Sequence, residues 1–521
     1  MHYFTPQLFF SLDEAGDFPG SAARQLGIPK SAILDWKFHK RSLDVRQKRP
    51  KYQAILDIEI SPRDKMLAFQ LEKKGCTVAA PDFRLPSFAK RTSPPHIAIV
   101  GAGPSGLFAA MTFAEAGFKV EIFERGKMVS ERTRDVAGLM HNAVLNPESN
   151  ICFGEGGAGT YSDGKLMTRT KSKYIPHILQ RFVQFGADSS ILYEAHPHIG
   201  TDRLTPILVE MRKWLESRGI RYHFGQRVDD FKIESGRCRG IIVNGDFHPA
   251  DAVFLCIGHS ADDTFNSLLH HGVAMEPKPL AVGVRVEHPQ ALINQIQYGR
   301  YANHPLLPPA EYAVRFNDDK LPSVFSFCMC PGGRVVASQT SENTRVVNGM
   351  SGSHRNGRFA NAALVVQVTP DMFPSGPLGG LQWIRTLERK AAMNCPPAFA
   401  PAQSMTDFIA HKTPSVSPKT TYSPGTHPSN LHAVLPKKIC IALEAALPVF
   451  NRQMHGFITQ DASFIGVESR TSSPVRILRN DKYQAVDIEG LYPLGEGAGY
   501  AGGITSCALD GISAAIACIQ K

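Results

Sequence analysis

Three closely spaced glycines and a distant acid form the first group of residues that could do chemistry. Gly101, Gly103 and Gly106 fit the spacing G-x-G-x-x-G, and Glu124 follows 23 positions after the first glycine. In this spacing the first glycine allows a tight turn, the second lets a pyrophosphate approach bare backbone, and the third lets a helix pack closely on a strand. A carboxylate about 20 residues further along can reach ribose hydroxyls. The group therefore predicts a dinucleotide site.

The elements around this group have the order that such a site requires. Residues 97–100 are continuously apolar, which is typical of a strand buried on both faces. Residues 107–116 are mostly good helix formers, and residues 120–123 have the pattern of a second strand that ends at the acid. Pro104 and Ser105 stand at the expected helix start, where free N–H groups and the helix dipole favour an anionic phosphate.

The last part of the sequence points to FAD in particular. Residues 490–517, which begin "GLYPLGEGAGYAGGIT", resemble the closing motif of FAD enzymes with a glutathione-reductase-type Rossmann domain. The resemblance implies that Gly495 and Glu496 form a turn at the ribityl or pyrophosphate region of FAD. It also implies that a helix start approaches the flavin ring, and the residues concerned are Gly502, Gly503 and Ile504.

A third segment, "DAVFLCIGHSADDT" at residues 251–264, lies between these two. It is similar to the strand and glycine at which the chain leaves the FAD domain in such enzymes, and that glycine is Gly258. In relatives, the residue at the place of Val228 contacts adenine through its backbone. Three such segments in the expected order favour FAD over a nicotinamide. No second complete glycine fingerprint follows a strand, so the sequence shows no dedicated nicotinamide domain.

The whole chain from about Pro95 onward resembles one family of bacterial FAD-dependent dehydrogenases, mostly of uncharacterised substrate. Four segments carry this resemblance: "NICFGEGGAGTYSDGKLMTR" (150–169), "FSFCMCPGG" (325–333), "NGMS" (348–351) and "SFIGVESRTSSPVRILR" (463–479). The resemblance implies that the first segment approaches the pyrophosphate and the flavin. Its predicted contact residues, together with two arginines upstream, are Gly156, Gly157, Thr160, Asp163, Lys165, Arg125 and Arg132. A cation near the ring would stabilise the negative charge of reduced flavin.

Cys328 and Cys330 allow two interpretations. They could form a disulfide that exchanges electrons with the flavin, if the thiols are accessible and their pKa values are lowered. A C-x-C bridge is strained, however, and the C-x-x-x-x-C arrangement of flavin disulfide reductases is absent. We therefore favour two small buried side chains in a strand. The cysteine spacings suggest no zinc site, so we predict no bound metal.

Composition bounds the remaining possibilities. Hydrophobic residues make up 43% of the 521 residues and charged ones 20%, which describes a globular protein. The sequence has no apolar run of 18 residues and no recognisable signal peptide, so we expect no membrane association. Ten cysteines without a framework suit a reducing compartment, which predicts a cytoplasmic protein.

We predict an α/β protein with three domains. Residues 1–92 form a small basic α+β domain, with a strand at 54–60, a helix at 63–75 and a linker at 90–95. Residues 93–270 begin a Rossmann-type FAD-binding domain, and residues 481–521 complete it. Residues 271–480 form an inserted α+β substrate domain.

The N-terminal domain carries a net charge of +6 within residues 1–95, out of +10 for the chain. The densest basic segment, residues 37–51, could bind an anionic partner such as nucleic acid. No nucleic-acid motif appears, so we favour a solvated face.

These observations leave three functions open. The first is an FAD-dependent oxidoreductase that acts on a small molecule, with NAD(P)H or a partner reductase as possible electron donor. The second is a flavoprotein of RNA modification, and the third is a non-enzymatic flavin-binding regulator. No catalytic residue is assigned, because His411, His427, His432 and the pair Arg285 and Glu287 are individually weak candidates for acid, base or anion anchor.

Overall fold

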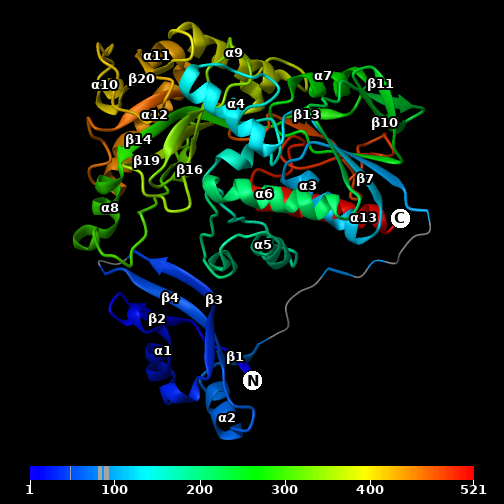
Figure 1. The fold of residues 1–521 in the computed structure, drawn as a ribbon. Coiled ribbons are helices and arrows are strands. Elements are labelled where there is room, and N and C mark those ends of the chain that lie inside the picture. Colours follow the sequence, from blue (N-terminus) through cyan, green and yellow to red (C-terminus); the bar gives the residue numbers. More distant parts are fainter. Residues whose placement is uncertain (47–48, 80–84, 87, 89–92) are drawn as a thin grey trace.

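The computed structural model describes residues 1–46, 49–79, 85, 86, 88 and 93–521. Figure 1 shows a small N-terminal unit, which includes the elements from β1 to β5, and a larger body formed by residues 93–521. The expected linker at residues 90–95 and the domain boundary at residue 92 lie wholly or partly outside the described residues, so both stay predictions.

The body is built around a five-stranded parallel sheet with the order β24-β12-β6-β7-β8. Its strands are β6 (His96–Val100), β7 (Lys119–Glu124), β8 (Arg221–Phe224), β12 (Ala252–Leu255) and β24 (Leu491–Pro493). The strands expected at residues 97–100 and 120–123 are therefore present. The closing segment lies beside β12, so the sheet joins the three segments that the sequence relates to FAD.

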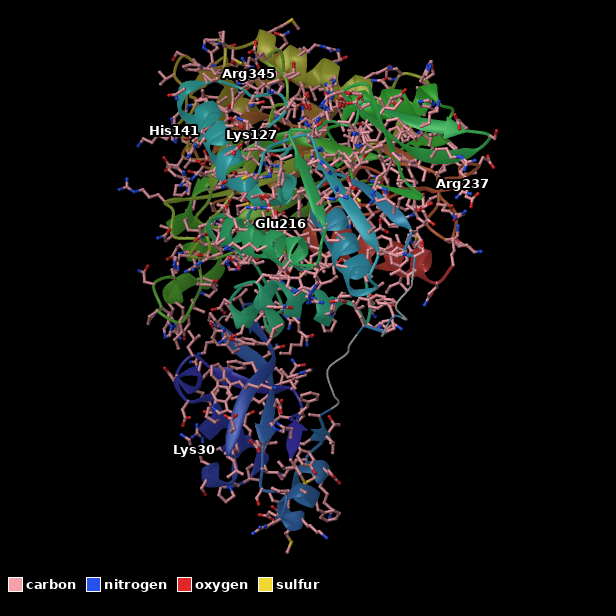
Figure 2. All side chains as sticks on the ribbon, turned by 45° about the vertical axis from the view of Figure 1, so that its right-hand side comes forward. Lys30, Lys127, His141, Glu216, Arg237 and Arg345 are labelled. Carbon is pink, nitrogen blue, oxygen red and sulfur yellow. The ribbon has the colours of Figure 1, made fainter. Side chains whose placement is uncertain are left out.

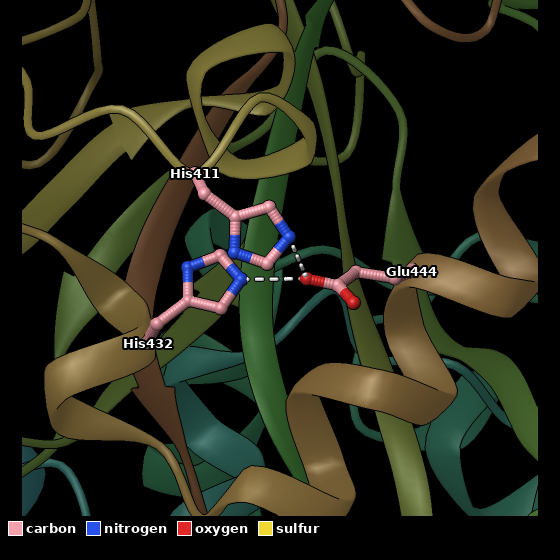
Figure 3. A group of neighbouring side chains, drawn as sticks. All are labelled: His411, His432 and Glu444. Atoms are coloured by element: carbon pink, nitrogen blue, oxygen red, sulfur yellow. Dashed lines mark hydrogen bonds and ion pairs between the residues drawn. The ribbon is translucent and has the colours of Figure 1, made fainter.

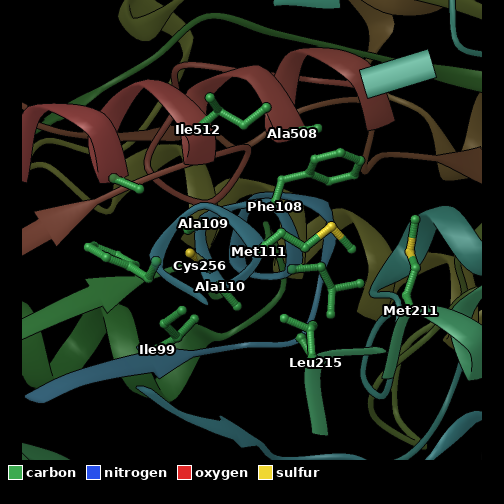
Figure 4. Packing of buried hydrophobic residues seen from close by; sticks show 14 of the residues in the cluster. Ile99, Phe108, Ala109, Ala110, Met111, Met211, Leu215, Cys256, Ala508 and Ile512 are labelled. Carbon is green, nitrogen blue, oxygen red and sulfur yellow. The ribbon is translucent and has the colours of Figure 1, made fainter. Parts of the chain in front are cut away.

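Helices cover one face of this sheet: α3 (Pro104–Glu115), α5 (Ile175–Gln184), α6 (Thr201–Glu216) and α13 (Ile504–Ile519). Figure 4 shows how Phe108 and Ala109 of α3 pack against Ala508 and Ile512 of α13. Gly511 permits this close packing, because a Cβ at that position would collide with the carbonyl oxygen of Ser105. The contact fixes the start of α13 beside the start of α3.

A three-stranded antiparallel sheet and one helix cover the opposite face. They are β9 (Asp230–Glu234), β10 (Arg237–Val243), β11 (Asp246–Pro249) and α7 (Asp262–His270). Phe231 and Ile241 of this layer are buried against Val100 and Phe123 of the parallel sheet. Both faces of the sheet are thus apolar, as its continuously apolar strands predict.

The second large element of the body is a seven-stranded mixed sheet between β12 and β24 in the sequence, with the order β15-β16-β19-β14-β22-β20-β21. Its strands are β14 (Leu280–Pro289), β15 (Arg315–Phe316), β16 (Val324–Cys330), β19 (Phe359–Val368), β20 (Ala400–Ser404), β21 (Thr426–Pro428) and β22 (Ser463–Glu468). Two short pairs accompany it: β13 (Met275–Pro277) with β23 (Val475–Ile477), and β17 (Arg334–Ala337) with β18 (Val347–Met350). We call this region, with its helices, the inserted domain.

The helices of the inserted domain are α8 (Gln290–Tyr298), α9 (Gly379–Met393), α10 (Met405–Ile409), α11 (Leu431–Val434) and α12 (Lys437–Gln453). A further helix, α4 (Val129–Asn142), lies between α6 and the pair β17 and β18. Among the helices described, none is both long and apolar enough to cross a bilayer.

Strand β14 shows how the inserted sheet separates its core from its polar face. Val282, Val284 and Val286 belong to the core that α8 and α12 cover. Side chains alternate along a strand, so Arg285 and Glu287 point to the other face, where both are fully buried. That face lies toward the parallel sheet and carries the charged groups discussed below.

The N-terminal unit has a core of its own, formed by Phe10, Leu56 and Leu71 among other residues. Its elements are β1 (His2–Phe4), β2 (Leu8–Ser11), α1 (Phe18–Leu26), β3 (Asp35–Asp44), β4 (Lys51–Glu59), α2 (Lys65–Lys73) and β5 (Thr77–Val78). The strand and the helix expected at residues 54–60 and 63–75 are present with shifted ends. Figure 2 shows Lys30 on this unit, away from Glu216 and Arg237 of the body.

The unit meets the body through strand β3 and through β4, where the hydroxyl of Tyr52 donates to the carbonyl of Leu306 at 2.6 Å. The backbone N–H of Arg41 donates to the carbonyl of Tyr193 at 2.7 Å, and the N–H of Ala195 donates back to Arg41 at 2.8 Å. The Arg41 guanidinium also pairs with Glu194. The same stretch of the body continues to His198, which forms a β-bridge with Lys165. The N-terminal unit therefore rests on the backbone that adjoins the glycine-rich segment 150–169.

Candidate cofactor site

A cavity of about 350 Å³ opens at the carboxyl ends of the parallel strands, where the parallel sheet faces the inserted domain. Residues from nine separate stretches of the chain line it. Among the predicted cofactor residues, those in the lining are Gly101, Gly103, Pro104, Ser105, Glu124, Arg125, Gly157, Asp163, Lys165, Val228, Gly258, Glu496, Gly502, Gly503 and Ile504. Ligands of open α/β sheets bind in this location.

The glycine fingerprint takes the geometry that its spacing predicts. Gly101 has a φ of 103°, and a Cβ there would collide with the carbonyl oxygen of Cys256. A Cβ at Gly106 would collide with the carbonyl oxygen of Gly101, so this glycine sets the distance between helix and strand. A Cβ at Gly103 would have only the Cα of Gly157 within 4 Å, at 3.9 Å, and would otherwise point into open space. Gly103 therefore leaves the approach to the backbone open.

Two helices begin at this cavity. Helix α3 starts after Gly103 and helix α13 after Gly503, and neither glycine has a side chain to cap the free N–H groups. Helix N-termini attract anions through these groups and through the helix dipole. The paired starts, with the bare backbone of the glycines between them, fit a pyrophosphate.

Glu124 lies at the end of β7 with its carboxylate held by backbone. Its Oε1 accepts hydrogen bonds from the N–H groups of Gly126 and Gly154, both at 2.9 Å, and its Oε2 accepts one from Ala102 at 2.9 Å. A carboxylate can accept about four hydrogen bonds. One acceptor position of Oε2 therefore remains, which fits a ribose hydroxyl.

Five predicted residues do not line this cavity: Gly106, Arg132, Gly156, Thr160 and Gly495. Arg132 is fully buried behind the glycine-rich segment and donates to the carbonyl oxygens of Asn150, Ile151, Glu155 and Gly157, at 2.6–3.0 Å. It holds the shape of the segment instead of reaching the cavity. Gly495 adopts a φ of 71° and lies against Ser105, so it acts through the turn.

A buried charge network surrounds Asp163, a fully buried residue of the cavity wall. Arg355 donates to both its oxygens, at 3.0 and 2.6 Å, while Lys165 and Ser351 also contact the carboxylate. Burial alone would raise the pKa of Asp163, but the charges of Lys165 and Arg355 outweigh it and hold the pKa well below its usual range. Asp163 therefore stays ionised and fixes the position of the Lys165 ammonium.

A second buried pair lies on the side of the inserted domain. Arg470 lines the cavity and forms a two-pronged ion pair with Glu388, with both N–O distances at 2.9 Å. Arg470 also donates to Ser260 at 3.1 Å, and Ser260 is 2.7 Å from Nδ1 of His259. Burial and the charge of Arg470 lower the pKa of His259 to about 3, so this cavity-lining imidazole is neutral.

Cys328 differs from its expected place. It lies at an irregularity of β16, has a φ of 45°, and lines the cavity, whereas Cys330 is fully buried. The interpretation as two buried strand residues is therefore wrong for Cys328. A hydrogen bond from Cys330, helped by the charges of Arg285 and Lys165, lowers the pKa of the Cys328 thiol below its usual range.

Arg285 and Glu287 lie behind the wall and line no part of the cavity. Arg285 donates to the carbonyl of Cys328 at 2.7 Å and pairs with Glu468 at 3.3 Å, so it supports the strand that carries the cysteine. Glu287 accepts from Thr420 at 2.6 Å, which gives it a structural role. Neither residue is positioned as an acid, a base or an anion anchor of the cavity.

Sequence reasoning missed Arg355, Glu388, Arg470 and His259 as parts of the site. Arg470 lies within one of the segments that carry the family resemblance, so that segment contained a signal. His259 directly follows Gly258 in the segment 251–264, which also contained a signal, whereas Arg355 and Glu388 come from stretches with no recognisable pattern.

Comparisons with known proteins indicate the same class. A model of NAD(P)-binding Rossmann-like domains matches residues 99–145, and a model described as FAD-dependent protein, C-terminal domain-like, matches residues 279–471. A domain of unknown function matches residues 7–59 in the N-terminal unit. Fold and site together define a flavoprotein with a Rossmann-type FAD-binding domain.

An uncharacterised protein of Clostridium beijerinckii is 38% identical to this chain over 508 residues, which are 96% of this chain and 95% of that protein. The chain belongs to this uncharacterised family of FAD-dependent oxidoreductases, and its cofactor is FAD.

More distant similarities were also found. The probable electron transfer flavoprotein-quinone oxidoreductase YdiS of Escherichia coli is 27% identical over 194 residues, which are 36% of this chain and 41% of that protein. Among solved structures, CtdE in complex with FAD has a TM-score of 0.32 at 12% identity, covering 82% of this chain and 84% of that chain. The Escherichia coli quinol fumarate reductase FrdA has a TM-score of 0.36 at 11% identity, covering 82% and 70%.

Proposed function

We propose that this protein is an oxidoreductase whose FAD exchanges a hydride or electrons with a small molecule bound against the inserted domain. One observation carries the proposal: the residues that fit FAD and side chains of the inserted domain line the same cavity. Phe327, Cys328 and Asn348 of the inserted domain face the same space as Lys165 and Gly502. Bound FAD would supply the redox chemistry.

Lys165 has the position of a charge-stabilising group in this proposal. Burial would lower the pKa of its ammonium, but the charge of Asp163 outweighs burial and raises it, so Lys165 is protonated at neutral pH. A fixed positive charge in a partly enclosed wall stabilises an anion more strongly than it would in water. Asp163 holds that charge in place, and Arg355 fixes the Asp163 carboxylate from behind.

The substrate side of the cavity is polar but nearly neutral in net charge. Arg470 is neutralised by Glu388, and His259 is uncharged. Cys328 contributes a thiol, and Asn348 contributes an amide. These groups suit a small polar substrate that is recognised by hydrogen bonds.

The electron donor is the second part of the proposal. The sequence contains no second dinucleotide fingerprint after a strand, so we expect NADH or NADPH alone to reduce the flavin slowly. Rapid reduction should require the true substrate or a partner reductase.

Anaerobic stopped-flow absorbance tests both parts. The FAD-loaded protein is mixed with NADH, with NADPH and then with fractions of a metabolite pool, and loss of the oxidised flavin band is followed. Fast, saturable reduction by NADPH alone would overturn the proposed donor. A flavin that no candidate reduces, in a protein that retains FAD, would instead favour a regulator.

Lys165→Met gives a matched test of the proposed charge. We expect it to keep FAD but to lower the flavin reduction potential, because the reduced flavin loses its nearby cation. Lys213→Met is the control, because Lys213 is exposed and pairs with Glu210 on α6. Equal potentials in both variants would contradict the role of Lys165.

A further inference from the structure

Two histidines and a glutamate converge on the inserted domain, at residues that do not belong to the cavity lining (Figure 3). His411 follows helix α10, His432 lies in α11, and Glu444 lies in α12. Nε2 of His432 is 2.7 Å from Oε1 of Glu444, and Nε2 of His411 is 3.0 Å from the same oxygen. Three segments of the chain thus aim one ligand atom each at a common point.

The ring of His432 is fixed on both faces. Phe408 stacks on one face with a centroid distance of 4.3 Å, and His411 stacks on the other at 4.4 Å. The side chain of His432 is 18% exposed, whereas that of His411 is 63% exposed. The stack therefore presents one rigid and one accessible imidazole to the carboxylate.

The tautomer of His432 follows from Asn430. Oδ1 of Asn430 accepts the backbone N–H of His432 at 3.0 Å, which identifies this atom as the amide oxygen. The same oxygen is 3.2 Å from Nδ1 of His432, so Nδ1 must carry a hydrogen and donate it. A neutral His432 then directs the lone pair of Nε2 toward a carboxylate oxygen. That arrangement is repulsive unless a positive charge lies between them.

A second hydrogen on His432 or a metal ion can supply that charge. Glu121 shows a different solution, because Arg221 gives its carboxylate a permanent cation at 3.2 Å beside two histidines. Within the described part of the chain, Glu444 forms ion pairs with its two histidines and with no lysine or arginine.

We propose that His411, His432 and Glu444 bind a divalent transition-metal ion of the zinc type, with water completing the coordination. Two imidazole nitrogens and one carboxylate oxygen are a donor set that zinc and similar ions use, and an exposed fourth position is normal for three protein ligands. Asn430 is the outer partner that orients His432, as such ligands require.

The distances need only a small adjustment. Ligand atoms around a tetrahedral zinc are about 3.3 Å apart. The two nitrogens are 2.7 and 3.0 Å from the carboxylate oxygen, and all three ligand atoms lie within 4.8 Å of one another, so shifts of about 1–1.5 Å bring them to this spacing. His411 can do so because its side chain is mostly exposed.

The ion would act as a clamp. His411 begins the segment of residues 411–430, which also carries Thr420 and Thr421, the hydrogen-bond donors to buried Glu287. A metal would tie the start of this segment to α11 and α12. This role is independent of the proposed oxidoreductase function.

Cobalt and zinc binding to the full-length, FAD-loaded protein provide the test. After treatment with a chelator and its removal, Co²⁺ is titrated by visible absorbance and Zn²⁺ by calorimetry. We expect one site per chain, with the visible bands of cobalt bound to nitrogen and oxygen. His411→Ala and Glu444→Gln should weaken binding at least about tenfold. His2→Ala is the control, since His2 is also exposed and pairs with one carboxylate, that of Asp57.

Thermal unfolding gives a second readout. Zinc should raise the Tm of the wild-type protein and of His2→Ala, and leave the Tm of the two ligand variants unchanged. The Tm and FAD content of metal-free variants show whether they fold. Folded variants that bind Co²⁺ and Zn²⁺ as tightly as the wild type, or a wild type without saturable binding, would overturn the proposal.

Discussion

The cavity has two different walls. The first, on the side of the parallel sheet, is made largely of backbone. The second is formed by the inserted domain and the segment around Asp163, and it contains buried ion pairs. On the first wall, glycines at 103, 502 and 503 leave out side chains so that a ligand can approach N–H groups. On the second, Arg470 depends on Glu388, and Lys165 depends on Asp163. The first wall recognises shape and phosphate, and the second holds charge at fixed points.

The difference has an energetic consequence. A glycine wall loses its ligand when a side chain fills the space, but the fold around it can persist. A buried ion pair that loses one partner leaves an uncompensated charge, which destabilises the whole fold. Substitutions of cavity glycines should therefore weaken FAD binding, whereas substitutions of ion-pair residues should lower the free energy of unfolding.

The largest effect on stability should come from Glu388→Gln. Arg470 and Arg385 would lose their shared carboxylate in the protein interior, which costs about 3–5 kcal/mol of unfolding free energy. Denaturant unfolding measures this loss. Glu210→Gln is the control, because its exposed pair with Lys213 contributes less than about 1 kcal/mol.

The same pair predicts a dependence on acid. Burial raises the pKa of Glu388, but Arg470 and Arg385 outweigh it and lower the pKa to about 2. The pair therefore stabilises the fold above the unfolded-state pKa of about 4.3, and this contribution is lost as the pH falls toward 2. The variant should lose less stability over this range than the wild type. An equal loss would show that Glu388 is not the group responsible.

A substitution in the glycine wall should reduce the affinity for FAD and leave the protein folded. Gly103 has a φ of −81°, which valine also adopts, so Gly103→Val adds a branched side chain to the cavity without backbone strain. FAD affinity should fall at least about a hundredfold, which corresponds to roughly 2.7 kcal/mol. Absorbance after gel filtration measures retained FAD. Gly16→Val, with open space around the added atoms, should stay fully loaded, and a yellow Gly103→Val would contradict the fingerprint.

Cys328 lines the cavity on the side of the inserted domain, and we expect it to react as a thiolate. Because its pKa is lowered, alkylation by iodoacetamide should reach half its maximal rate at a pH well below the value of about 8.5 that is typical of a free cysteine. Cys330→Ala should move the midpoint upward, because it removes the hydrogen bond. Peptide mapping separates Cys328 from the other thiols, and buried Cys440, with a pKa raised to about 11, should remain unmodified. A midpoint near pH 8.5 in the wild type would contradict the assignment.

Reactivity does not make the pair a redox disulfide. We expect the double variant Cys328→Ser with Cys330→Ser to take up the same number of electrons per flavin as the wild type, with modestly lower stability. Anaerobic dithionite titration counts these electrons. Two additional electrons in the wild type would show that the cysteines are redox-active.

Removal of residues 1–92 should have the smallest effect. The N-terminal unit has its own core, and its elements do not line the cavity. The shortened protein should keep FAD, and its Tm should change by no more than about 4 °C. Loss of FAD or aggregation would show that the contact of Arg41 with residues 193–195 is needed for the body to fold.

The sequence predicted the two walls unequally, and the reason is physical. Gly101 to Glu124 act through local backbone geometry, so their spacing along the chain contains the information. The pairs of Asp163 with Arg355 and of Glu388 with Arg470 join residues that are far apart in the sequence, and only the packed sheets determine them. The same limit hid the cluster of His411, His432 and Glu444, because no short motif contains all three.

Two local expectations failed for reasons that the backbone makes clear. Arg132 resembles a cofactor contact in its sequence position, but its guanidinium donates hydrogen bonds to four carbonyl groups of the glycine-rich segment and does not reach the cavity. Cys328 lies in an apolar run, but an irregularity in strand pairing turns its side chain to the cavity. Neither effect leaves a trace in hydrophobic periodicity.

The position of β24 beside β12, and of α13 along α3, has a consequence for how the protein is made. A ribosome releases the glycine fingerprint long before residues 491–519, yet those residues supply one strand of the sheet and one of the two helix starts at the cavity. A growing chain therefore keeps the apolar faces of β12 and α3 unpaired until residues 491–519 have been made. The cavity gains its second helix start only then, so we expect firm retention of FAD to require this closing segment.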